Sequence, residues 1–240
     1  LGGNAKINIV NRPGASGDIG FTAIANAAPD GYTIGFINTP PVLTTPIERK
    51  ANYTWQSYDL LGNVVDDPGT FCVHNDSPHK TLADVAAFAK ANPGRFTYTT
   101  IGRATTNAIA METMARESGV QFSHVPGKGG GEGLSAVLGG HIMAMVESPA
   151  WGPLVASGEM RLLFLLNQER SKKWPDTPTI RELGYQYTFD SPYGVVGLKG
   201  MDPGITKKLH DAFRLAYDDP KVIETYDKFD FVRRYMSTAD

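Results

Sequence analysis

The middle of the chain carries one glycine-rich turn, Val125-Pro126-Gly127-Lys128-Gly129-Gly130-Gly131-Glu132-Gly133-Leu134-Ser135. It follows a short β-type run over residues 121–125 and opens an apolar run over residues 134–138 that is typical of a helix. The first N–H groups of a helix have no partner inside the helix, and the helix dipole is positive there, so such a turn can hold an anion. Glycines let the backbone approach a ligand closely, and Lys128 adds a positive charge. The stretch therefore predicts a strand–loop–helix unit with one side of an anion site.

Phosphate is the first ligand to consider for such a turn, but the spacing of its glycines and lysine does not match a phosphate-binding motif. A phosphate-binding P-loop has a glycine five residues before its Gly-Lys pair, and here Phe122 holds that place. Residues 131–136 match the dinucleotide pattern G-x-G-x-x-A, and Glu147 ends the next strand pattern. However, Glu132 would lie where a pyrophosphate binds. A small nucleotide-dependent enzyme and a glycine-rich connector without a ligand remain as alternatives.

Strand patterns and helix patterns alternate outward from this turn along almost the whole chain. This alternation predicts an α/β fold with parallel sheets and helices on both faces. Ligands of such sheets bind beyond the carboxyl ends of strands, which selects the loops at 11–17, 38–41, 101–107 and 126–133. We expect residues 40–57 to be irregular or only briefly helical. The other expected strands are 6–10, 32–37, 58–64, 70–73, 96–100, 141–147, 162–166 and 194–198, and the other expected helices are 18–28, 82–91, 106–118, 178–183, 203–217 and 221–229.

Composition excludes several classes of protein. The chain of 240 residues has 23 Lys and Arg against 25 Asp and Glu, so it lacks the basic excess of a nucleic-acid-binding domain. Cys72 is the single cysteine, which rules out an intramolecular disulfide. No apolar run approaches the ~20 residues of a membrane span. The sequence begins at Leu1 without a methionine, and we expect an N-terminal piece to have been removed or to be missing from this sequence.

No set of side chains typical of catalysis or metal binding is present. The five histidines lack metal-ligand spacing, so neither a metal nor another cofactor is expected. No G-x-S-x-G elbow occurs, and turn chemistry explains the adjacent acids Asp66-Asp67 and Asp218-Asp219. In the loop Gly102–Asn107, the short polar side chains either cap a helix or present donors to a carboxylate. We therefore favour a binding protein over an enzyme.

Six segments in order resemble motifs of the tripartite tricarboxylate transporter solute-binding proteins, the Bug family. Each motif is modest, but six in the same order across nearly the whole chain are specific. The segments are Val10–Gly20 (N-R-P-G-A-G-G-N-I-G), Ala28–Thr33 (P-D-G-Y-T), Thr81–Gly94 (T-L-A-E-L…A-K-A-N-P-G), His124–Gly129 (H-V-P-Y-K-G), Leu138–Gly140 (L-x-G-G) and Pro175–Gly184 (P-D-V-P-T-x-x-E-x-G).

The resemblance implies a type II periplasmic binding protein fold, in which two α/β lobes hold a ligand in the cleft between them. Residues 1–70 and 192–240 would form lobe 1, and residues 71–191 lobe 2. The implied function is that of a periplasmic receptor that delivers a carboxylate to membrane permease subunits, with no nucleic-acid partner. The ligand would be a dicarboxylate, a tricarboxylate or an aromatic carboxylate. The implied ligand-binding residues are Asn38, Thr39, Gly102, Thr105, Thr106, Asn107, Pro126, Lys128, Gly129, Gly130, Gly131 and Asp190.

Three departures from the family pattern bear on the ligand. Family members carry a strand and a P-F-x-x-G-G-x-x-D loop before the N-R-P-G segment, and the sequence starts after that point, so we expect one wall of the pocket to be absent from it. Gly127 stands where the family usually has tyrosine, and Ala108 where it often has histidine. The freed space predicts a ligand bulkier or less polar than a C4 dicarboxylate. An effector-binding domain of a transcription regulator can share this fold and remains an alternative, although no N-terminal helix-turn-helix is visible.

Overall fold

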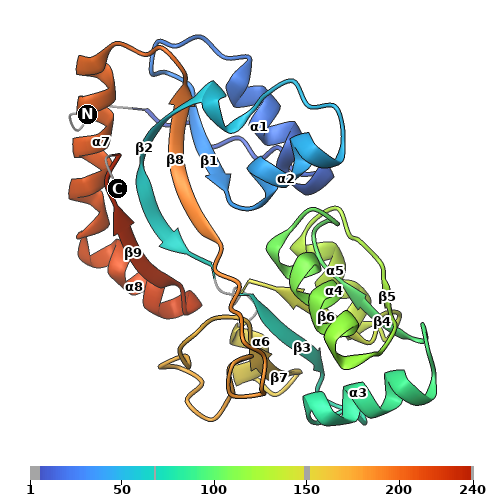
Figure 1. Cartoon of the computed structure of the whole chain (residues 1–240). Helices are drawn as coiled ribbons and strands as arrows, with labels where there is room; N and C mark the ends of the chain where they lie inside the picture. Colours follow the sequence, from blue (N-terminus) through green and yellow to red (C-terminus); the bar gives the residue numbers. More distant parts are fainter. Residues whose placement is uncertain (1–5, 68, 149–151, 239–240) are drawn as a thin grey trace. The chain divides into compact units, whose positions relative to one another are not determined.

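The chain folds as two compact units, Leu1–Asp66 with Pro192–Asp240, and Asp67–Ser191 (Figure 1). The computed structural model describes residues 6–67, 69–148 and 152–238. The lobe boundaries expected from the sequence are after residue 70 and after residue 191.

The first unit is built on one antiparallel sheet. Its strand order is β1-β8-β2-β9, formed by β1 (Ile34–Asn38), β8 (Pro192–Leu198), β2 (Tyr58–Asp66) and β9 (Val232–Met236). Both β1 and β2 pair antiparallel with β8, and β9 pairs antiparallel with β2. The prediction of a parallel sheet is wrong here, because the chain leaves the unit along β2 and returns along β8 in the opposite direction.

Helices cover both faces of this sheet, and neighbouring residues of β8 show it. Val196 packs in a cluster with Phe21 and Ile24, whereas Val195 packs in another cluster with Leu209 and Tyr217. The alternation follows from the two-residue period of a strand. The helices of the unit are α1 (Asp18–Ala25), α2 (Pro41–Glu48), α7 (Pro203–Tyr217) and α8 (Pro220–Phe229), with 3-10 turns at Ala15–Gly17 and Trp55–Ser57.

Residues 6–10 do not form the expected strand. Their alternating pattern is typical of a β-strand, but they pair with no strand among the described residues. The side chains of Ile7 and Ile9 are therefore exposed, at 76% and 83%. A strand exists only through its ladder of inter-strand hydrogen bonds, which a pattern of side chains cannot supply by itself.

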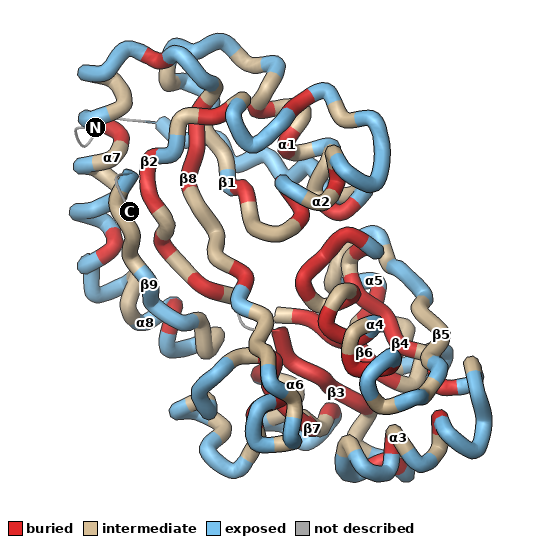
Figure 2. The backbone as a smooth tube through the Cα atoms, in the orientation of Figure 1, coloured by how far each residue is buried: buried red, intermediate tan, exposed pale blue. Residues whose placement is uncertain are grey.

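The second unit contains a mixed sheet with the strand order β5-β4-β6-β3-β7. β4 is parallel to both of its neighbours, β5 and β6, as predicted, but β3 is antiparallel to both β6 and β7. Figure 2 shows β3 and β6 buried along almost their whole length. The strands are β3 (Thr70–His74), β4 (Phe96–Thr99), β5 (Phe122–His124), β6 (Ala144–Glu147) and β7 (Met160–Leu165).

The helices of this unit begin and end largely where capping residues predict. α3 (Leu82–Ala91) starts with a capping box, in which Asp84 N donates to Thr81 Oγ1 at 3.2 Å and Thr81 N donates to Asp84 Oδ2 at 2.9 Å. α4 (Thr106–Ser118) ends at Gly119, which is left-handed at φ 62°. α5 (Gly130–Leu138) and α6 (Gly152–Ala156) follow.

The helix expected at residues 178–183 is wrong. This segment forms turns and contributes one isolated bridge to the sheet, between Thr179 and Leu165. Thr179 and Glu182 bond each other as a capping pair would, with Thr179 N donating to Glu182 Oε2 at 2.8 Å. Gly184 at φ 101° then ends the turn. One turn forms too few hydrogen bonds to offset the entropy lost in nucleating a helix.

Candidate ligand site in the second unit

Several polar loops of the second unit meet at one edge of its sheet. Parallel strands β4, β5 and β6 all end there. Because β3 is antiparallel to β6 and β7, its first residue, Thr70, lies opposite Glu147 and Leu165. The carboxyl ends of β4, β5, β6 and β7 and the start of β3 therefore share this edge, which is where α/β sheets bind ligands.

The loop between β4 and α4 is held by its own hydroxyl groups. Thr100 Oγ1 donates to Gly102 O at 2.9 Å and accepts from Gly102 N at 3.2 Å. Thr105 Oγ1 also donates to Gly102 O, at 2.9 Å, and accepts from Ala108 N at 3.3 Å, which caps α4. From the sequence, the Thr105 hydroxyl could either cap a helix or donate to a carboxylate. The cap found here fixes the place where a ligand would meet this hydroxyl.

The neighbouring Asn107 packs tightly against the start of β3. A Cβ atom added to Gly69 would lie 2.2 Å from Asn107 Oδ1, so only glycine leaves room for this side chain. Thr106 is buried next to it. The start of α4 therefore packs closely against the residue that precedes β3.

The glycine-rich turn is more helical than the sequence predicts. α5 begins at Gly130, four residues before the apolar run at Leu134. Lys128 N donates to Glu132 Oε2 at 2.7 Å, so the carboxylate in the first turn of α5 bonds back to the residue before the N-cap residue, Gly129. The amides of Gly130 and Gly131 have no hydrogen-bond partner among the described residues. The amide of Gly129 likewise has none within the described part of the chain, so three successive amides are available as donors.

One backbone hydrogen bond and the side chain of His124 fix the position of the turn. Gly127 N donates to Thr100 O at 2.8 Å, which ties the turn to the end of β4. His124 stacks on Tyr98, with ring centroids 4.7 Å apart and planes 9° apart, and its Nε2 lies 3.0 Å from Thr100 Oγ1. Burial, with a smaller contribution from Arg103, lowers the pKa of His124 to about 4. His124 is therefore uncharged at neutral pH.

Glu147 lies between the two loops, and the sequence did not predict this role. Its side chain is 8% exposed. Oε1 accepts a hydrogen bond from Ile101 N at 3.1 Å, and a Cβ atom at Gly130 would lie 3.6 Å from Oε2. The only sequence signal was the position of Glu147 at the end of a strand, which we weighed as part of a dinucleotide pattern. One side chain thus contacts the loop before α4 and the first turn of α5.

Asp67, a partly buried acid, is a second carboxyl group close to Glu147. Burial raises the pKa of Glu147 to about 7. Burial and the charge of Glu147 raise the pKa of Asp67 to about 8. Asp67 Oδ1 is buried and has no partner among the described residues. Turn chemistry, which explained the Asp66-Asp67 pair in the sequence, does not account for this environment.

Three other predicted ligand residues belong to other segments of the chain. Asn38 ends β1 in the first unit, and Thr39 follows it, with Thr39 N donating to Pro192 O at 3.3 Å. Asp190 is exposed near the end of the second unit. Asp67 and Glu147 are additions from the structure. Eight predicted ligand residues belong to the same unit: Gly102, Thr105, Thr106, Asn107, Lys128, Gly129, Gly130 and Gly131. Pro126, which was also predicted, is exposed in this unit.

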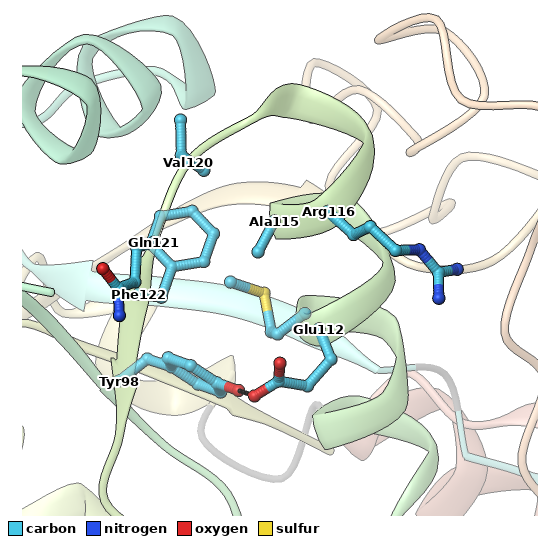
Figure 3. A pocket seen from close by; sticks show the side chains of 8 residues that line it. Tyr98, Glu112, Ala115, Arg116, Val120, Gln121 and Phe122 are labelled. Atoms are coloured by element: carbon cyan, nitrogen blue, oxygen red, sulfur yellow. Dashed lines mark hydrogen bonds between the residues drawn. The ribbon is translucent and has the colours of Figure 1, made fainter. Parts of the chain in front are cut away.

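A separate small hollow lies between α4 and β5. Its volume is about 210 Å³, and none of the predicted ligand residues lines it. Figure 3 shows Glu112 beside Tyr98, whose hydroxyl lies 3.4 Å from Glu112 Oε1, while Arg116 points away from the hollow. Its lining residues are Tyr98, Met111, Glu112, Ala115, Arg116, Val120, Gln121 and Phe122.

Among residues 6–67, 69–148 and 152–238, no group of three or more His, Cys, Asp and Glu side chains is arranged to hold a metal ion. The described helices include none that is both long and apolar enough to cross a bilayer.

The chain is similar to proteins of one transport family throughout its length. A Cupriavidus necator protein described as "UPF0065 protein in gbd 5'region" is 42% identical over 233 residues, which is 96% of this chain and 70% of that protein. A structure described as a periplasmic transporter superposes with a TM-score of 0.88 at 26% identity, over 96% of this chain and 78% of that one. An R. palustris protein solved with adipate shows the same fold, with a TM-score of 0.87 at 22% identity over 96% of this chain and 78% of that one.

This family consists of transport receptors with a periplasmic binding protein fold, not of enzymes. The match to its sequence pattern covers residues 4–240. The chain belongs to the tripartite tricarboxylate transporter family receptors, TctC.

Proposed function

We propose that this protein is a periplasmic receptor that captures a small organic carboxylate and delivers it to the permease subunits of a tripartite tricarboxylate-type transporter. Besides family membership, one structural observation supports the proposal. The amides of Gly130 and Gly131 open α5 without a partner among the described residues, at the sheet edge where ligands of α/β folds bind. Unpartnered amides and the positive end of a helix dipole favour a carboxylate.

The surrounding residues have separate roles in this proposal. Thr105 and Thr106 border the anion from the start of α4, and Asn107 is held against Gly69. Lys128 is exposed and adds a positive charge that attracts an anionic ligand. Asn38, Thr39 and Asp190 remain proposed ligand residues on the family resemblance alone.

The ligand class rests on chemistry and on a protein of the same fold. That protein was solved with adipate, a C6 dicarboxylate. In this chain, packing does not require glycine at position 127, because a Cβ atom there would lie 3.5 Å or more from its nearest neighbours. The space left by Gly127 supports the hypothesis of a ligand bulkier or less polar than a C4 dicarboxylate.

A thermal-shift screen followed by calorimetry tests the proposal. The panel contains malate, succinate, adipate, longer aliphatic diacids and aromatic carboxylates, with NAD and ATP as the competing class. A ligand present at 100 times its dissociation constant should stabilise the protein by about 2.7 kcal/mol. We expect at least one carboxylate to do so and the nucleotides not to. Stabilisation by NAD or ATP alone would contradict the proposal, and preference for malate or succinate would contradict the size hypothesis.

A further inference from the structure

Glu147 and Asp67 form an acid pair directly beside the proposed anion site. Thr70, the first residue of β3, pairs with Glu147 and donates its hydroxyl to Glu147 O at 2.5 Å. Asp67 precedes Thr70 by three residues. Ser148 contacts both acids, since its N–H lies 3.4 Å from Glu147 Oε2 and its side chain bonds to Asp67. The two carboxyl groups are therefore neighbours that share one polar contact residue.

No cation offsets this pair within the described part of the chain. The hydrogen bonds of the Glu147 carboxylate come from the backbone amides of Ile101 and Ser148. The charged groups on the adjoining loops are Arg103, Lys128 and Glu132, and all three are exposed. His124 on β5 is uncharged at neutral pH. Two buried carboxylates without a counter-ion reduce their charge by binding protons.

The ligand would bring a third negative charge to the same place. Glu147 Oε2 faces Gly130, whose free amide is one of the two proposed carboxylate donors. Oε2 lies on the Cβ side of Gly130, so an anion held by the first turn of α5 would share the surroundings of this carboxyl group, and like charges repel strongly where water is scarce. A proton on Glu147 removes the repulsion and turns the carboxyl group into a hydrogen-bond donor toward the ligand.

We propose that carboxylate binding at the start of α5 is coupled to proton uptake by the Asp67–Glu147 pair. This inference rests on the proposed function. The proton comes from solvent and is held on a carboxyl oxygen of the pair for as long as the ligand stays bound. Affinity therefore falls as the pH rises, because the free pair loses the proton that the bound state requires.

Isothermal titration calorimetry tests the coupling, with adipate and malate as probes and then the tightest carboxylate of the screen. Titrations at pH 8 in buffers of different ionisation enthalpy count the protons taken up. We expect uptake approaching one proton per ligand at pH 8. For one coupled proton, affinity should fall by up to about tenfold per pH unit between pH 7 and pH 9.

Neutral isosteres provide the matched variants. Glu147→Gln should flatten the pH dependence of the affinity, and Asp67→Asn should reduce the proton count. Glu169→Gln removes an exposed acid of the same unit and should leave both quantities as in the unchanged protein. If Glu147→Gln fails to fold, the buffer dependence of the unchanged protein and the Asp67→Asn variant still decide the question.

The outcomes separate the two proposals. Carboxylate binding with an affinity that is flat from pH 6 to pH 9 overturns the coupling and leaves the proposed function intact. Affinity for a carboxylate that increases with pH also overturns it, because proton uptake on binding requires the opposite dependence. If no carboxylate binds at any pH, both proposals fail.

Discussion

Glu147 Oε1 accepts a hydrogen bond from the backbone amide of Ile101 at 3.1 Å, although the two residues are 46 positions apart. The bond joins the end of β6 to the loop that leads into α4. On its other side the same carboxyl group faces the first turn of α5 at Gly130. The two loops proposed to bind a carboxylate are thus organised around a buried acid.

Replacing Glu147 should change stability in a pH-dependent way. The pKa is about 7 in the folded protein against 4.5 for an ordinary glutamate. The folded state therefore binds the proton more tightly, and its stability is lost as the pH rises from about 4.5 through 7. Glu147→Gln does not ionise, so relative to the unchanged protein it should gain roughly 2–3 kcal/mol between pH 5 and pH 8. Urea unfolding at the two pH values measures this, and an equal difference at both would contradict it.

Gly130→Ala should separate folding from binding. Alanine favours a helix over glycine by up to about 1 kcal/mol, so α5 should not be weakened. The added methyl group would lie 3.6 Å from Glu147 Oε2 and cover the free amide. We expect affinity for adipate or the best carboxylate of the screen to fall at least about tenfold, or about 1.4 kcal/mol. Calorimetry and thermal unfolding of the same sample check both parts. Ser135→Ala on the same helix is the control, and unchanged affinity in Gly130→Ala would contradict the proposed donor.

Thr105→Ala should cost stability through the lost cap of α4. The Thr105 hydroxyl accepts from Ala108 N and donates to Gly102 O. Removing such a cap costs about 1 kcal/mol. Thr105→Ser keeps the hydroxyl and should retain most of the stability, as measured by urea unfolding. If the alanine and serine variants unfold at the same urea concentration, the hydroxyl does not cap the helix.

Gly127→Tyr should shift ligand preference toward smaller diacids. A side chain can start from this position, since its Cβ atom would meet neighbours only at 3.5 Å or beyond. The aromatic ring would fill space that the size hypothesis assigns to a bulky ligand. The ratio of adipate to malate affinity, measured by calorimetry, should fall in the variant. A ratio that stays constant would show that position 127 does not face the ligand.

Much of the local structure could be predicted from short-range signals. The capping box at Thr81 and Asp84 and the glycine after Ser118 act within one helical turn, so the sequence suffices to locate them. The glycine turn was located correctly, but the start of α5 was placed too late because a run of glycines has low helix propensity. Here the hydrogen bond from Lys128 N to Glu132 Oε2 closes the turn before the helix and helps to offset that cost.

Residue pattern and motif order by themselves determined the α/β class, the family and the loops that carry polar donors, because these depend on periodicity and on neighbours in sequence. Tertiary structure alone decided which strands pair and in which direction. Residues 6–10 have a strand pattern without a partner, and β8 runs against the direction that alternation predicts. It also decided that Asp67 and Glu147, 80 positions apart, become neighbours beside Gly130. Their chemistry arises from shared burial and mutual charge, which exist only after the chain has folded.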